Sequence, residues 1–227
     1  MRDNSLRSGS YALLTPPAIE PVTIAESKAH TRIDIADDDA YIAALITGAR
    51  EQIEQQTGRS LITQTWTLSL SQWPREKSDH DWWDGVREMP ISATYGSAMD
   101  IAKSPFQSVS AIDILDEAGN ATSWPKLDPV TGAPNWYGVA DNSFGRLARA
   151  NGQAWPVPLR YTNGIRITFT CGYGANASDV PGALRHAIKM LAAHWYENRE
   201  PTAIRGGAST ELPHNVRSLI ASFQVLR

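Results

Sequence analysis

The sequence has a single cysteine, Cys171, which excludes an internal disulfide bond and every zinc site built on several cysteines. It has no apolar run of membrane-spanning length, and its first residues lack the apolar centre of a secretory signal. It also lacks a strong excess of one charge, since the formal net charge is -3. A basic surface that grips nucleic acid is therefore not expected. These absences predict a soluble intracellular protein that binds no membrane.

Recognisable catalytic motifs are lacking as well. The sequence contains no phosphate-binding loop, no His-Glu-x-x-His and no nucleophile elbow. The densest group of possible metal ligands lies in residues 79–84 and consists of Asp79, His80, Asp81 and Asp84. Their spacing matches no defined metal motif, and two tryptophans stand among them. An exposed loop that buries its tryptophans is thus the alternative to a cation site.

Helical periodicity marks both ends of the chain. Near the start, Thr23 and Glu26 form a capping box, and Gly58 has the properties of a residue that ends a second helix. Near the end, apolar residues spaced by three and four positions predict helices within residues 179–200 and 210–223. Two N-terminal and two C-terminal helices are therefore expected.

The middle of the chain has the two-residue period of half-buried strands instead. This alternation predicts strands over residues 64–71, 109–115, 121–124, 145–148 and 165–171. Helices, strands and helices follow one another in blocks, without regular alternation. The fold class predicted from this order is α+β, a helical core that carries an inserted antiparallel β module.

Three parts are expected along the 227 residues, which suffice for one large or two small domains. Residues 1–20 are polar or rich in proline and would form an extended N-terminal arm. Residues 21–60 and 179–227 would form the helical core. Residues 61–178 would form the inserted β-rich module.

Charge is distributed unevenly between the two helical ends. Residues 20–60 carry eight acids and four bases, whereas residues 185–227 carry six bases and three acids. One explanation is a pair of ordinary solvated helix faces. The other is a pair of complementary patches that meet between neighbouring copies, with Asp37, Asp38, Glu51, Glu54, Arg185 and Lys189 as the candidate interface residues.

Seven short stretches occur in a characteristic order: Pro21-Val-Thr-Ile-Ala-Glu-Ser-Lys-Ala-His30, Asp38-Asp-Ala-Tyr-Ile-Ala-Ala-Leu-Ile46, Thr57-Gly-Arg-Ser-Leu-Ile-Thr-Gln-Thr-Trp66, Ser104-Pro-Phe-Gln-Ser-Val109, Phe169-Thr-Cys-Gly-Tyr-Gly174, Val180-Pro-Gly-Ala-Leu-Arg-His-Ala-Ile188 and His194-Trp-Tyr-Glu-Asn-Arg-Glu200. Together they resemble the head–tail connector (adaptor) proteins of tailed bacteriophages, prophages and gene transfer agents. The resemblance runs from about residue 20 to the C-terminus. The sequence departs from the family in the segment 74–97, which is longer here than is usual. The resemblance therefore implies no role for residues 79–84.

The resemblance implies a structural, non-enzymatic protein without cofactors in the neck of a virion or phage-like particle, assembled in the host cytoplasm. Such proteins form a ring, commonly of twelve copies, under the portal protein. The ring extends a channel through which double-stranded DNA passes without specific binding, and it docks head-closure (stopper) or tail proteins. The C-terminal segment typically reaches the portal, which makes Phe223, Val225, Leu226 and Arg227 the candidate portal contacts. Packing of this tail on its own subunit is the alternative.

Two other functions remain open from the residues. The chain could be a phage-particle hydrolase of cell wall or nucleic acid that uses residues 79–84. It could also be a ligand-binding module with its site in the β insertion. Activity assays with and without divalent cations would separate the hydrolase from a structural protein.

Overall fold

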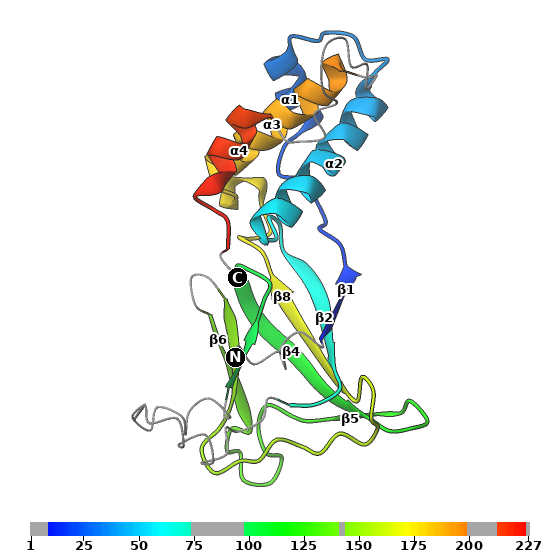
Figure 1. Cartoon of the computed structure of the whole chain (residues 1–227), viewed down its shortest axis with the longest axis vertical. Helices are drawn as coiled ribbons and strands as arrows, with labels where there is room; N and C mark the ends of the chain where they lie inside the picture. The colour runs from blue at the N-terminus through cyan, green and yellow to red at the C-terminus, as the bar shows by residue number, and fades with distance from the viewer. Residues whose placement is uncertain (1–8, 74–97, 141–143, 199–212, 226–227) are drawn as a thin grey trace, which may run out of the picture. The chain divides into compact units, whose positions relative to one another are not determined.

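The computed structural model describes residues 9–73, 98–140, 144–198 and 213–225 (Figure 1). The chain forms two compact units, each built from two segments that are distant in the sequence. The β unit comprises Met1–Pro16 and Gln64–Cys171, and the helical unit comprises Pro17–Thr63 and Gly172–Arg227. The fold is therefore α+β with an inserted antiparallel module, as the sequence predicted.

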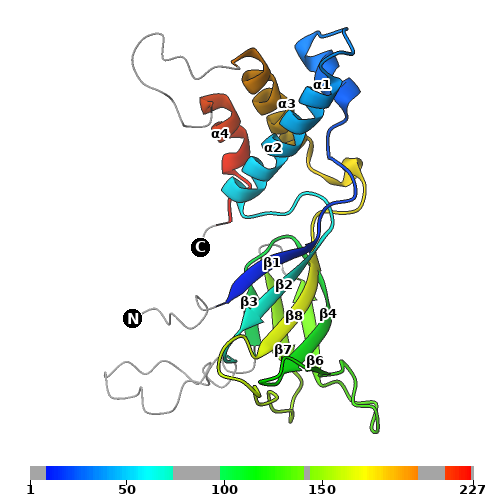
Figure 2. The same ribbon diagram turned by 90° about the vertical axis from the view of Figure 1, so that its right-hand side faces the viewer.

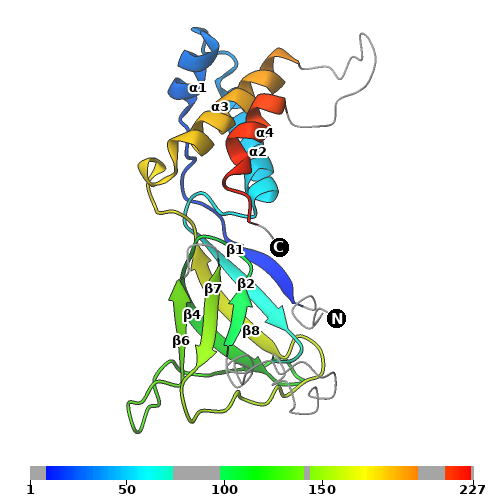
Figure 3. The same ribbon diagram turned by 60° about the vertical axis from the view of Figure 1, so that its left-hand side comes forward.

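The described part of the helical unit contains four α-helices: α1 (Ile24–Thr31), α2 (Asp39–Thr57), α3 (Gly182–Glu197) and α4 (His214–Ala221). Helix α3 packs against each of the other three helices (Figure 3). Its apolar stripe includes Leu184, Ile188 and Leu191, which are buried together with Ile46 and Ile53 of α2. The three-to-four residue spacing of this stripe puts these side chains on one face, so α3 forms the centre of the helical core.

Local signals in the sequence set the helix ends. Thr23 Oγ1 accepts a hydrogen bond from the Glu26 amide at 3.1 Å, and the Glu26 carboxylate accepts one from the Thr23 amide at 2.9 Å. Helix α2 ends at Gly58, whose φ of 70° is favourable for glycine. Pro181 and Pro213 immediately precede α3 and α4. The capping box and the glycine cap predicted from the sequence are thus present.

The described part of the β unit contains eight strands: β1 (Ser10–Thr15), β2 (Gln64–Leu70), β3 (Ala98–Ile101), β4 (Phe106–Leu115), β5 (Ala121–Ser123), β6 (Trp136–Ala140), β7 (Gly145–Arg149) and β8 (Ile165–Cys171). They form a five-stranded sheet of order β1-β2-β8-β4-β5 and a three-stranded sheet of order β3-β7-β6 (Figure 2). All neighbouring strands are antiparallel. Strands β6 and β7 contact β4, so the two sheets pack face to face.

The core of the β unit follows the pleat of its central strands. In β8, Ile165, Ile167, Phe169 and Cys171 are buried, whereas the residues between them are half-buried or exposed. Strand β2 lies beside β8 over its full length, with Leu68 opposite Ile167. Side chains of a strand alternate between its two faces, so every second residue reaches the core. Cys171 is a buried thiol at the end of this strand.

The N-terminal segment requires a correction. Residues 1–20 were expected to form an arm, but residues 10–15 form β1 and pair with β2 at the edge of the larger sheet. Strands β3 and β6 were not predicted. Both pair with β7, which was predicted over residues 145–148, but their own residues show no clear strand pattern, so their strand conformation depends on the hydrogen bonds to β7.

Glycine is required at position 172, within the Phe169–Gly174 stretch that contributes to the family resemblance. Gly172 has a φ of 136°, and a Cβ atom at this position would lie 2.6 Å from the backbone carbon and oxygen of Ile62. An alanine there would have a strained backbone and would force the two segments apart.

We expect Gly172→Ala to lower the free energy of unfolding by roughly 2 kcal/mol, measured by urea denaturation. The matched control is Gly182→Ala at the start of α3, where an added Cβ meets no atom within 4 Å. Alanine favours helix over glycine, so this control should be neutral or stabilising. Equal stability of the two variants would show that the close approach at Gly172 does not constrain the fold.

Candidate functional site

The four acids proposed for a subunit interface lie at two separate places on the helical unit. Asp37 and Asp38 precede α2, whereas Glu51 and Glu54 lie in its second half. A rise of 1.5 Å per residue separates the two pairs by about 20 Å along the helix. Asp38 accepts a hydrogen bond from the Tyr196 hydroxyl at 2.5 Å. The acids therefore do not form one continuous patch, and Asp37 and Glu51 are the two exposed members.

Glu54 belongs to an ion-pair network around a buried arginine. Arg50 is 5% exposed, and its guanidinium donates to Glu20 at 2.9 Å and to Glu54 at 2.8 Å. Glu51 lies 3.4 Å from the same guanidinium. Burial alone would lower the pKa of Arg50, but the carboxylates of Glu54 and Glu20 outweigh this and raise the pKa. The second Glu54 oxygen accepts from the Leu61 amide at 2.7 Å. Glu54 therefore stabilises its own subunit.

The basic candidates Arg185 and Lys189 lie one turn apart on α3. The Arg185 guanidinium contacts the Glu26 carboxylate at 2.5 Å and donates to the Pro21 carbonyl at 2.9 Å. The hydrogen bond from the Thr23 amide, together with Arg185, keeps the pKa of Glu26 below its usual value. Arg185 thus links α3 to the start of α1. Like Glu54, it makes its contacts within its own subunit.

Two histidines lie beside Lys189. The rings of His30 and His186 are 5.6 Å apart and nearly perpendicular. Partial burial, the neighbouring His186 and Lys189 together lower the pKa of His30. His30 therefore becomes protonated, and adds positive charge to this face of α1 and α3, only at a pH below the usual pKa of histidine.

Of the four candidate portal contacts at the C-terminus, two contact the helical unit and two lie outside the described residues. Phe223 is half-buried against the helical core, and its carbonyl accepts from Arg59 Nε at 2.6 Å. The Val225 amide donates to the Thr57 carbonyl at 3.0 Å. Leu226 and Arg227 lie outside the described residues. The part of the tail that can be seen is thus fastened to its own helical unit.

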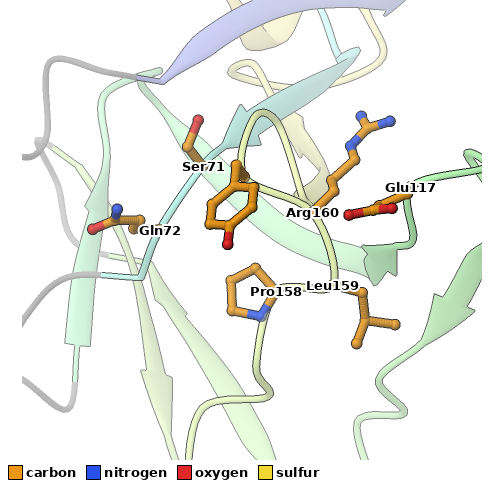
Figure 4. A pocket seen from close by; sticks show the side chains of 7 residues that line it. Ser71, Gln72, Glu117, Pro158, Leu159 and Arg160 are labelled. Carbon is orange, nitrogen blue, oxygen red and sulfur yellow. The ribbon is translucent and has the colours of Figure 1, made fainter.

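The β unit carries an open hollow of about 330 Å³ at the end of β2 (Figure 4). Ser71 and Gln72, which directly follow that strand, line it together with Glu117 from the turn after β4, and the loop before β8 provides the other side. The lining residues of this loop are Pro158, Leu159, Arg160 and Tyr161. Among its described lining residues, the hollow has one carboxylate, Glu117, and one guanidinium, Arg160.

Metal chemistry finds no support in the part of the chain that the structure covers. Within the described ranges, no group of three or more His, Cys, Asp or Glu side chains could hold a metal ion. Asp79, His80, Asp81 and Asp84, the only candidates from the sequence, lie outside those ranges. Among the helices described, none is long and apolar enough to cross a bilayer.

Comparison with known proteins identifies the family. Residues 21–82 and 159–223, more than half of the chain, match the phage gp6-like head-tail connector proteins. The chain belongs to this family. The match covers the helices and the central strands β2 and β8, and it omits residues 83–158, which contain β3 to β7. A structural connector role follows from membership. No curated protein sequence matches the chain significantly.

Solved structures resemble this connector over almost its whole length. A chain from the neck of an empty gene transfer agent particle, computed with C6 symmetry, is 24% identical with a TM-score of 0.70. Chains from the native gene transfer agent virion and from its neck computed with C12 symmetry have TM-scores of 0.69 and 0.68, at 24% and 23% identity. Each comparison covers 96% of both chains. The β unit, which the family match mostly omits, is thus also part of a known fold.

Proposed function

We propose that the chain assembles as a ring of twelve copies in the neck of a virion or phage-like particle, after synthesis in the host cytoplasm. The ring lies under the portal protein, extends the DNA channel and docks a head-closure or tail protein. The observation that carries this proposal is the combination of connector family membership with a fold shared over 96% of a chain from a neck computed with C12 symmetry. The proposed role requires no catalysis and no cofactor.

A ring needs one face of a subunit to meet a different face of the next. The exposed acids Asp37 and Glu51 and the basic residue Lys189 can contribute to such a contact. Three other interface candidates from the sequence also make hydrogen bonds within the helical unit: Asp38, Glu54 and Arg185. Their contribution to a contact between subunits would therefore be smaller. The net charge of -3 suits a channel through which DNA slides without being held.

Assembly provides the direct test of the ring. The isolated chain should sediment as a monomer or weak oligomer, and it should form rings when purified portal is added. Negative-stain images of the mixture would show the ring stacked on the portal. A tight, salt-independent dimer as the only species of the isolated chain would contradict the proposal.

We also propose that the C-terminal residues Phe223, Val225, Leu226 and Arg227 form the portal contact. Phe223 and Val225 also contact the helical unit, so besides their part in the portal contact they hold the segment in place for Leu226 and Arg227.

Deleting Leu226 and Arg227 should leave the melting temperature of the chain unchanged and reduce its co-sedimentation with portal by at least about tenfold. The control is Phe223→Ala, which should lower stability because Phe223 packs on the core. Normal co-sedimentation of the shortened chain would show that the tail only packs on its own subunit.

A further inference from the structure

The loop before β8 presents apolar side chains to solvent in a regular pattern. Val157, Leu159 and Tyr161 are 77%, 54% and 94% exposed, and we call these three residues the apolar ridge. The two residues between them, Pro158 and Arg160, are half-buried. Exposed and half-buried residues thus alternate along this loop, and the large apolar residues are the exposed ones. A soluble protein rarely exposes such a group unless another surface covers it.

The apolar ridge is held in place from its N-terminal side by tryptophans. The Trp155 ring stacks on the Trp73 ring, with centroids 4.3 Å apart and planes 18° apart. Trp124 packs against both rings, at 5.7 Å from Trp155 and 6.0 Å from Trp73. Trp73 Nε1 also donates to the Pro156 carbonyl at 2.7 Å. These contacts fix the chain just before Val157.

Hydrogen bonds hold the other side. Arg160 donates through Nε and Nη2 to the Asn163 carbonyl at 3.1 and 2.8 Å. The Asn163 amide donates to Ser71 Oγ at 3.2 Å. The loop is therefore attached to the end of β2 after Tyr161. A surface held in its conformation before binding loses little entropy when a partner covers it.

The ridge lies at a defined end of the larger sheet. The chain passes between the two units next to Pro16, Gln64 and Cys171. Gln64 and Cys171 are paired at one end of β2 and β8, and Thr15 pairs with Thr65 at the same end. Leu70 and Ile165 are paired at the other end, about 20 Å away for strands of this length. The apolar ridge ends at Tyr161, four positions before Ile165. It is therefore at the end of the β unit that is away from the chain crossings.

The size and charge of the ridge limit what can cover it. Its three side chains expose a few hundred Å², less than the roughly 800 Å² per partner of a stable pairwise interface. Such a contact is weak in a single copy and strong only when many copies bind at once. Among the residues that the structure describes, the adjoining hollow is lined by one cation, Arg160, and one carboxylate, Glu117, so these residues supply no cationic excess for anionic lipid.

A second copy of the chain also fits poorly. The ridge and the hollow are on the same part of the surface, since Leu159 and Tyr161 contribute to both. Insertion of one ridge into the hollow of another copy would give a two-fold pair, which does not continue around a ring.

We infer that the apolar ridge is the surface with which each copy in the ring docks a partner protein of the particle through an apolar patch on that partner. This inference rests on the proposed function, because a repeated weak contact requires a ring. The portal contact proposed above uses the C-terminal segment, so the partner assigned to the ridge is the other protein of the proposed function, the head-closure or tail protein that the ring docks.

The test uses heads without tails, taken from the particle whose genes encode this chain, together with purified tails. Heads are assembled with wild-type chain, with a ridge variant (Val157→Ser, Leu159→Ser and Tyr161→Ser together) or with a control variant. The control changes three similarly exposed apolar residues of the β unit, Leu127→Ser, Val130→Ser and Val139→Ser. Gel analysis measures the chain in the heads, and electron microscopy counts the particles that have joined a tail.

The ridge variant should keep its melting temperature, enter heads in normal amounts and reduce tail joining by at least about tenfold, whereas the control should join normally. Normal joining by the ridge variant would overturn the inference. Failure of this variant to enter heads would place the ridge between copies or at the portal, which would also overturn it. Absence of the wild-type chain from heads would instead contradict the proposed function.

A lipid surface is tested separately with the isolated chain. Flotation with vesicles of phosphatidylcholine, alone or mixed with phosphatidylglycerol, should recover neither the wild-type chain nor the ridge variant. Flotation of the wild-type chain that is lost in the ridge variant would make the ridge a membrane contact and would overturn the docking of a protein.

Discussion

Replacing Leu191 with alanine should lower the free energy of unfolding of the helical unit by about 2–5 kcal/mol. Leu191 is 1% exposed and lies on α3, the helix that packs against α1, α2 and α4. The substitution removes buried methyl groups and leaves a cavity that four helices cannot easily close. Interiors are packed as densely as organic crystals, so such a cavity is costly.

The measurement is urea denaturation followed by circular dichroism at 222 nm, which reports mainly on the helices. The control is Glu197→Ala in the last turn of the same helix, where the side chain is exposed. This control should change stability by no more than about 0.5 kcal/mol. A Leu191→Ala variant that unfolds with the wild type would show that the inner stripe of α3 is not the core of the helical unit.

Much of the helical unit could be predicted because its signals are local. The Thr23–Glu26 capping box and the cap at Gly58 involve residues within one turn of each other. The stripe of α3 is also contained in one helix, so its period identifies the buried face without knowledge of the partner helices. The alternation in Ile165–Cys171 likewise identified a central strand.

Strand β1 could not be predicted because its partner is distant in the sequence. Ser10 pairs with Ser69, and the segment itself is short and follows residues that have no periodic pattern. An edge strand of this kind acquires its conformation from hydrogen bonds to β2. Local propensity could equally describe an extended arm.

The candidate surfaces were harder to predict than the fold. The sequence identified the charged residues, but it could not show that Glu54 forms an ion pair with Arg50 or that Arg185 forms one with Glu26. It also could not identify the apolar ridge, because Trp155 and Val157 look equally suited to a core. Only the structure shows that Trp155 is packed between rings whereas Val157 faces solvent. Whether a charged or apolar residue stabilises its own subunit or is available to a partner therefore depends on neighbours that only the structure identifies.

The network around Arg50 leads to the second large effect. We expect Arg50→Met to lower the free energy of unfolding by about 3–5 kcal/mol, because it leaves partly buried carboxylates without their cation. The Glu20 and Glu54 side chains are 29% and 15% exposed, so water can stabilise them only in part. Arg50→Lys should recover little, because a single ammonium cannot reproduce the fork of the guanidinium toward several carboxylates.

The double variant Arg50→Met with Glu54→Gln separates the loss of charge balance from the loss of packing. Glutamine keeps an oxygen that can accept from the Leu61 amide, while the unpaired charge is removed. The double variant should therefore be more stable than Arg50→Met by at least about 1 kcal/mol in urea denaturation. If Arg50→Met matches the wild type, the ion pair between Arg50 and Glu54 does not stabilise the subunit. Glu54 would then count, like Asp37 and Glu51, among the acids that could contact a neighbouring copy.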